Sequence, residues 1–193
     1  MPGGVIVDLS FPQNWNAEVL AARPMILPQR HFVYPREVEE VERGALEVLV
    51  HPGASGAGPF LATCALGFRD PAVPSGIWSA PDPNVICAVS GGYVYVIDTA
   101  APERFTMIAY RPVLGVRAVI EERLLLFAGH RSILAWGREG QAWESEKLSD
   151  EGVTITEIEG GVLRGMGWEM RSDAERPFAL DLRTGRRIAA AQP

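Results

Sequence analysis

Tryptophan is the residue type whose placement in this sequence best suits binding chemistry, because four of the five tryptophans lie from residue 78 onward. An exposed indole offers a flat apolar surface on which a sugar ring or a partner side chain can stack. Trp78 runs directly into the rigid stretch Ser79-Ala-Pro-Asp-Pro-Asn84, where Asp82 could accept hydrogen bonds. We therefore expect Trp78 and Asp82 to face a ligand. The alternative is an ordinary Pro- and Asp-containing turn.

Two further residues complete the candidate binding set. His130 precedes an arginine at the expected tip between two strands, and Trp136 stands in Ala-Trp-Gly within a strand-like run. The imidazole could serve as a base or a polar contact, and a solvated turn is its alternative. Packing between sheets is the alternative for the indole.

The sequence contains no complete motif of a reactive site. The small-residue loop over 51–59 has glycines at P-loop separation, but Pro59 stands where that motif needs lysine. The three histidines have no partner at the spacing that metal sites use. The carboxylate pairs fall at expected turns or on alternate strand positions, which favours solvent-facing roles. We expect no catalytic residue, no metal and no cofactor.

Charge and cysteine content narrow the function classes. The net charge of −6 disfavours nucleic acid and anionic membranes as partners. Cys64 and Cys87 each lie inside an apolar run, which predicts buried free thiols. No signal peptide is readable, and no apolar run approaches the roughly 20 residues that span a bilayer. We expect a cytoplasmic protein.

The elements that must position these residues are short strands. Runs rich in Val, Ile, Leu and aromatic residues alternate with Gly, Pro, Asp and Asn from about residue 76 onward. First strands are predicted to begin near Gly76, Gly115 and Gly152, and second strands near Asn84, Glu122 and Gly161, at spacings of about 38 residues. Third strands are predicted over 93–98, 132–137 and 177–182, and fourth strands over 104–109, 141–145 and 186–190.

Four strands in about 38 residues is the size of a β-propeller blade. We therefore expect an all-β chain forming one small propeller-like domain, 1–193, of about four blades. The predicted parts are an irregular N-terminal arm over 1–37 and blades over 38–75, 76–113, 114–151 and 152–190. A strand over 5–9 is expected to pair into the last blade and close the ring. The alternatives are a β-sandwich or an incomplete propeller completed by a homodimer.

Two resemblances bear on this interpretation. The stretch Ala179-Leu-Asp-Leu-Arg-Thr-Gly185 resembles part of the tryptophan-docking repeat of quinoprotein propellers, but Ala189 replaces its final Trp, so the resemblance supports blade geometry and no quinone cofactor. Residues from about 60 to 188 also resemble a group of short uncharacterised bacterial proteins. That resemblance rests on the stretches 60–68, 78–83, 90–93, 135–137, 143–145 and 181–185. It implies no activity.

These observations favour a non-catalytic binding or protein-interaction module whose partner is a protein or a small polar ligand. The alternative is a hydrolase-like enzyme acting on a small polar or carbohydrate substrate. Such an enzyme would use carboxylates brought together from several blades.

Overall fold

The computed structural model describes residues 4–35, 43–53 and 58–188. The described residues contain sixteen strands in four open sheets and no α-helix, so the all-β prediction is confirmed. Within them, no helix is long and apolar enough to cross a membrane. The chain divides into two compact units, residues 1–112 and 113–193. A ring of four blades stays a prediction.

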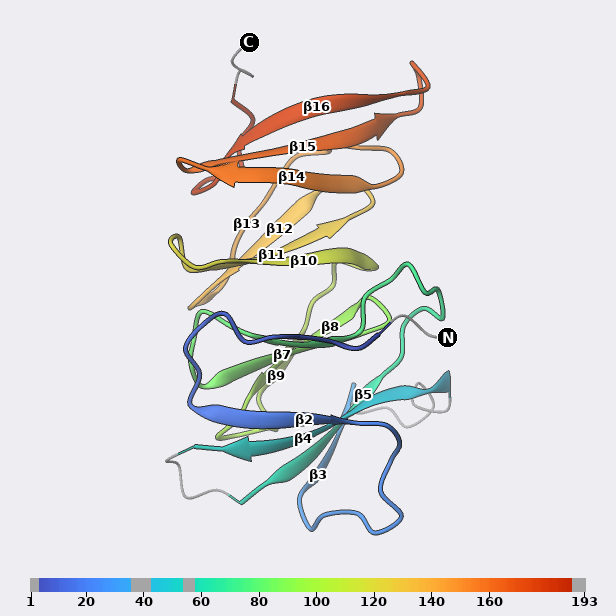
Figure 1. Cartoon of the computed structure of the whole chain (residues 1–193), viewed down its shortest axis with the longest axis vertical. Helices are drawn as coiled ribbons and strands as arrows, with labels where there is room; N and C mark the ends of the chain where they lie inside the picture. The colour runs from blue at the N-terminus through green and yellow to red at the C-terminus, as the bar shows by residue number, and fades with distance from the viewer. Residues whose placement is uncertain (1–3, 36–42, 54–57, 189–193) are drawn as a thin grey trace. The chain divides into compact units, whose positions relative to one another are not determined.

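Unit 1 contains two sheets (Figure 1). The first has the order β2-β4-β5-β3, in which β3 runs parallel to β5 and the other pairs are antiparallel. Its strands are β2 (Trp15–Leu20), β3 (His31–Tyr34), β4 (Ala45–Pro52) and β5 (Phe60–Ala65). The second sheet has the order β1-β6-β7-β8-β9. Its strands are β1 (Ile6–Asp8), β6 (Gly76–Ser79), β7 (Val85–Ser90), β8 (Tyr93–Asp98) and β9 (Phe105–Met107).

The core of unit 1 lies between these sheets. Alternate residues of each strand point to one face, and the inward set includes Val48, Phe60, Ile86 and Tyr95. The Tyr95 hydroxyl of β8 donates to the carbonyl of Ala65 of β5 (3.0 Å), so a fully buried side chain of this core ties one sheet to the other.

The prediction for the N-terminal arm is wrong. Residues 1–37 contain β1, β2 and β3, which complete both sheets of unit 1. Of the four prolines over 10–36, Pro12, Pro24 and Pro28 lie between these strands and Pro35 directly follows β3, so at none of these positions does the missing N–H cost a ladder bond. The described residues of the predicted blade over 38–75 supply β4 and β5. Its acidic segment over 37–43 falls almost wholly outside the described residues.

The predicted partner of the first strand is also wrong. β1 pairs in parallel with β6 of its own unit, not with the last sheet of the chain. Gly76 explains this pairing, because a Cβ at that position would lie 2.0 Å from the carbonyl oxygen of Ile6. The missing side chain lets the two backbones approach.

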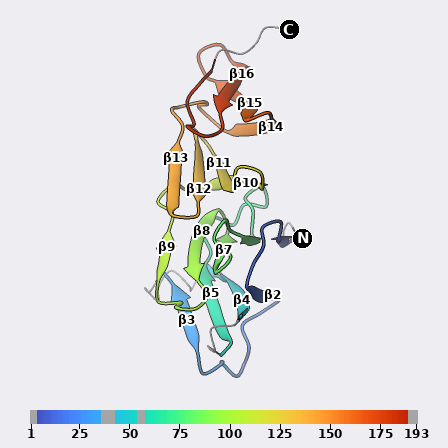
Figure 2. The same ribbon diagram turned by 90° about the vertical axis from the view of Figure 1, so that its left-hand side faces the viewer.

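Unit 2 also contains two sheets (Figure 2). The first is the meander β10 (Val113–Val119), β11 (Leu124–Gly129), β12 (Ile133–Gly137) and β13 (Gly140–Glu144). The second is β14 (Val153–Glu159), β15 (Val162–Glu169) and β16 (Ala174–Asp181). A single bridge from Leu180 to Arg187 stands where a fourth strand was predicted. The predicted first, second and third strands all coincide with observed strands to within a few residues.

The core of unit 2 is centred on Leu126, Ile133, Leu163 and Leu180, which face one another from its two sheets. Trp143 closes one side of this core. Its indole N–H donates to the carbonyl of Leu182 (2.9 Å), so the buried nitrogen keeps a hydrogen bond.

Candidate functional site

Trp78 lies in a buried strand and Asp82 stabilises a turn. Trp78 is 2% exposed on β6, so the expectation of a ligand-facing indole is corrected. The reason is that β6 lies inside the sheet between β1 and β7, and all four of its residues are buried. Asp82 is half-buried and accepts the backbone N–H of Asn84 (3.0 Å), which is the turn role given above as the alternative.

His130 and Trp136 lie at the end of β11 and on β12. His130 is exposed directly after β11, and Trp136 is half-buried on β12 opposite Leu125. Neither residue lines either hollow of unit 2 described below.

The tryptophan that does line a cavity is Trp168, on β15. It lies directly opposite Glu175 of β16, while Thr154 of β14 lies opposite Met166, which is two residues before Trp168 and therefore on the same face of β15. Directly opposed residues share one face of a sheet with their Cβ atoms about 5 Å apart. The ladder register therefore gathers an indole, a carboxylate and a hydroxyl on one face.

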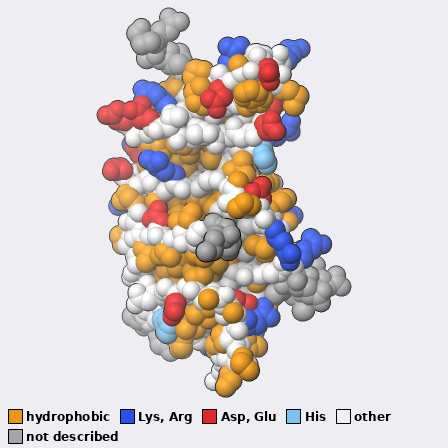
Figure 3. All heavy atoms as spheres, turned by 45° about the vertical axis from the view of Figure 1, so that its right-hand side comes forward, with side chains coloured by type: hydrophobic (Ala, Val, Ile, Leu, Met, Phe, Trp, Pro, Cys, Tyr) orange, Lys and Arg blue, Asp and Glu red, His pale blue; other side chains and the backbone are white. Residues whose placement is uncertain are grey.

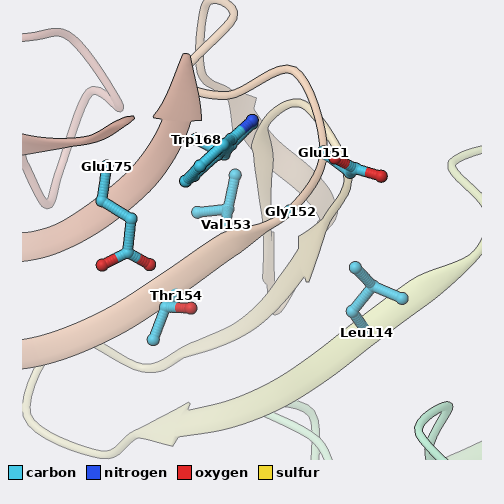
Figure 4. Close-up of a pocket in the computed structure, with 7 residues that line it drawn as sticks. All are labelled: Leu114, Glu151, Gly152, Val153, Thr154, Trp168 and Glu175. Atoms are coloured by element: carbon cyan, nitrogen blue, oxygen red, sulfur yellow. The ribbon is translucent and has the colours of Figure 1, made fainter. Parts of the chain in front are cut away.

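These side chains line a hollow of about 460 Å³, called here the Trp168 hollow. Its lining residues are Leu114, Glu151, Gly152, Val153, Thr154, Trp168 and Glu175. In Figure 4 the indole stands over Val153, and the carboxylate of Glu175 extends toward Thr154. Glu151 lies at the margin and points away from the ring. Both charged lining residues are acidic, so the hollow favours a ligand that donates hydrogen bonds.

The backbone of Trp168 is held firmly. Ser149 Oγ accepts its N–H (2.9 Å) and donates to its carbonyl (3.2 Å), and the N–H of Asp150 donates to the same carbonyl (2.8 Å). Gly167 permits this contact, because a Cβ there would lie 2.3 Å from the carbonyl oxygen of Leu148. The indole is thus presented from a fixed backbone, which lowers the entropy lost when a ligand binds.

A second hollow, of about 550 Å³, also includes Trp168 in its lining. It is lined by Lys147, Leu148, Ser149, Asp150, Trp168, Glu169, Arg176 and Arg187. Lys147 pairs with Asp150, and Arg176 pairs with Glu169 (3.3 Å). The hydrogen bond from Lys147, then that from the N–H of Met170, lowers the pKa of Asp150. The charges around this hollow therefore largely compensate one another, which makes it the weaker ligand site.

Unit 1 has one buried charged network. Glu47 accepts from Arg23 Nε (2.8 Å) and from Thr63 Oγ1 (2.5 Å). Because the Thr63 proton is committed to Glu47, the hydroxyl oxygen accepts from His31 Nε2 (2.9 Å). Burial first, and then the charge of Arg23, lowers the pKa of His31. Each of the four side chains has a hydrogen-bond partner within the network. We therefore interpret the network as structural, because it connects the loop after β2 with β3, β4 and β5.

The described residues carry little else that is reactive. Cys64 and Cys87 are free and buried, as predicted, and burial raises the pKa of both thiols far above the range where thiolates form. No group of three or more His, Cys, Asp or Glu side chains in the described ranges is placed to hold a metal ion.

Comparison with known proteins adds no family. No family model and no curated protein matches the chain. Among solved structures, the computationally designed Ika4 protein is 10% identical over 56% of this chain and 66% of its own, with a TM-score of 0.40. The computationally designed Ika8 protein is 10% identical over 74% of this chain and 45% of its own, with a TM-score of 0.43. The chain thus spans less than two thirds of either length, and at these scores the likeness carries no conclusion.

Proposed function

We propose that this protein is a non-catalytic binding module that holds a small polar ligand in the Trp168 hollow. The observation that carries the proposal is the cross-strand placement of Trp168 against Glu175. The indole supplies an apolar surface for stacking, and the carboxylate supplies an acceptor beside it. A ligand that suits both has an aliphatic face and outward hydrogen-bond donors, as a sugar or an amine does.

Ligand titration followed by tryptophan fluorescence tests the proposal. The probes are panels of monosaccharides and of small amines. We expect saturable binding of at least one probe, weakened by about tenfold or more in Trp168→Ala, the cost of losing one good stacking contact. Glu175→Gln should weaken the same probe, because the acceptor strength of the carboxylate is lost.

Two matched variants serve as controls. Glu159→Gln removes a carboxylate of β14 outside the hollow, and Trp136→Phe alters an indole of unit 2 that does not line it. Both should bind like the parent protein. If Trp168→Ala and the parent protein bound the probe equally well, the Trp168 hollow would not be the binding site.

The enzymatic alternative rests on one observation, the presence of Glu151 and Glu175 in one hollow. Glycoside hydrolysis uses a pair of carboxylates flanking the scissile bond. A hydrolase would turn over an aryl glycoside, and both Glu151→Gln and Glu175→Gln would abolish turnover while binding persisted. The binding module predicts no turnover in the parent protein.

We further infer that the four sheets are blade-like repeats of one propeller-like domain in a cytoplasmic bacterial protein. Supporting this are the consecutive antiparallel strands β6-β7-β8, β10-β11-β12 and β14-β15-β16, which recur at about 38 residues. Spin-label distances between residues of the two units test the ring arrangement. A broad distribution from independently moving units would contradict it.

A further inference from the structure

The loop between β2 and β3 carries Met25 and Ile26, the two most exposed large apolar side chains of the described residues, followed by exposed Leu27. Met25 is 103% exposed, Ile26 90% and Leu27 45%, and the three are consecutive. At the end of unit 1 where this loop lies in Figure 1, the space-filling view shows a projecting group of apolar side chains (Figure 3). Isolated exposed apolar residues are ordinary, but three together at a tip indicate an interaction surface.

Both ends of this loop are anchored. On the β2 side, Arg23 Nε bonds the buried carboxylate of Glu47 (2.8 Å). On the β3 side, the carbonyl of Arg30 accepts the N–H of Leu61 (3.0 Å). Pro24 and Pro28 flank the tip and restrict its backbone. The apolar side chains are therefore held outward rather than free to fold back onto the sheet.

The charge of the loop differs from that of the chain. Residues 20–31 contain Arg23 and Arg30 and no Asp or Glu, whereas the whole chain has a net charge of −6. Glu47 neutralises Arg23. Arg30 lies over the rings of Phe32 (5.7 Å) and Phe60 (5.6 Å) and donates to the Gly58 carbonyl, and no carboxylate among the described residues pairs with it. The base of the tip thus keeps a positive charge.

We propose that this loop is a peripheral membrane contact, which inserts Met25, Ile26 and Leu27 among lipid headgroups and places Arg30 near anionic phosphates. A convex apolar tip needs a matching apolar hole to bind a protein, whereas a lipid interface accepts it without a preformed shape. Apolar side chains with a nearby cation are the combination that favours interfacial binding. The tip is short, so the contact is weak and reversible. The expectation of no membrane partner used the net charge of the chain and did not consider this local charge.

Vesicle flotation with the full chain tests the proposal. The probes are vesicles of phosphatidylcholine alone and of phosphatidylcholine with about one quarter phosphatidylglycerol. We expect the parent protein to float with the mixed vesicles. The double variant Met25→Asp, Ile26→Asp should lose that binding by about tenfold or more, because each charge is costly to insert. Arg30→Gln should reduce the preference for the anionic vesicles.

Met170→Asp is the matched control, since Met170 is 71% exposed in a turn of unit 2 and should not affect flotation. If the aspartates disturb folding, the milder pair Met25→Ser, Ile26→Ser should still weaken flotation in a protein with the parent's melting curve. Absence of flotation by the parent, or equal flotation by the folded double variant, would overturn the proposal. Concentration-dependent self-association without flotation, relieved by the double variant, would assign the tip to a second copy of the chain instead.

Discussion

Trp168 and Glu175 lie directly opposite each other on the neighbouring strands β15 and β16. The indole and the carboxylate therefore stand on one face of the sheet, beside Thr154 of β14. This arrangement follows from strand register alone. A shift of β16 by one residue would turn Glu175 to the opposite face and dismantle the hollow.

Ser149 should be important for holding Trp168 in place. Its hydroxyl oxygen accepts the N–H groups of Trp168 (2.9 Å) and Gly152 (3.1 Å) and donates to the Trp168 carbonyl (3.2 Å). Ser149→Ala should lower the free energy of unfolding by about 1–3 kcal/mol, because buried backbone groups lose their partner. Urea denaturation measures this change. Ser172→Ala, at an exposed turn, should change it little, and an equal loss in both variants would contradict this role.

Gly185 should tolerate no side chain. A Cβ there would lie 2.4 Å from the Trp143 ring, and the backbone φ is +68°. Gly160 provides the matched control, since its φ is +57° and nothing lies within 4 Å of its Cβ position. Both alanine variants incur positive-φ strain, but Gly185→Ala should cost about 1–3 kcal/mol more because it overpacks the core. Equal decreases in melting temperature in the two variants would show that the contact with Trp143 does not cause the destabilisation.

His31 should make stability depend on pH. Burial and Arg23 hold its folded-state pKa below the ordinary value of 6.5. Between the folded-state pKa and 6.5 the unfolded chain binds more protons than the folded chain, so the free energy of unfolding should fall as pH is lowered through that interval. Above pH 6.5 the contribution of His31 to the free energy of unfolding is constant. Urea unfolding from pH 7.5 to pH 5 should show a smaller fall in His31→Gln than in the parent, and an equal fall in both proteins would contradict this role of His31.

Cys64 and Cys87 should be unreactive in the folded protein. Both are fully buried, and burial raises the pKa of each thiol, so little thiolate forms. An aromatic disulfide reagent should label neither residue under native conditions and both in denaturant. Rapid native labelling of Cys64 would contradict the packing between the sheets of unit 1, and rapid native labelling of Cys87 would contradict its complete burial.

Strand positions could be predicted because turn residues and apolar runs are local signals. The glycines after Ser90 illustrate this, since Gly91 and Gly92 both adopt positive φ in the tight turn between β7 and β8. The partner of β1 could not be predicted, because strand pairing is a long-range property. The prolines before residue 36 favoured an irregular arm, which was wrong. A proline indicates a loop, but it does not indicate whether strands lie on either side of that loop.

The site was missed for a different reason. Trp78 and Trp168 both stand in short apolar runs, and loop chemistry alone favoured Trp78. The informative signal was the alternation Gly165-Met-Gly-Trp168. Cβ atoms at Gly165 and Gly167 would clash with neighbouring backbone oxygens at 2.3 Å, so that face of β15 is closely packed. Trp168 must then lie on the opposite face, which a strand pattern could have indicated.

Nuclear magnetic resonance of the five indole N–H groups would measure ligand contact most directly. During titration with the tightest-binding sugar or amine of the panel, the Trp168 resonance should shift in a saturable manner, while the resonances of buried Trp15, Trp78 and Trp143 stay in place. The Glu175→Gln variant should need more ligand for the same shift. Saturable binding that leaves the Trp168 resonance unmoved would place the ligand elsewhere and contradict the proposed role of this hollow.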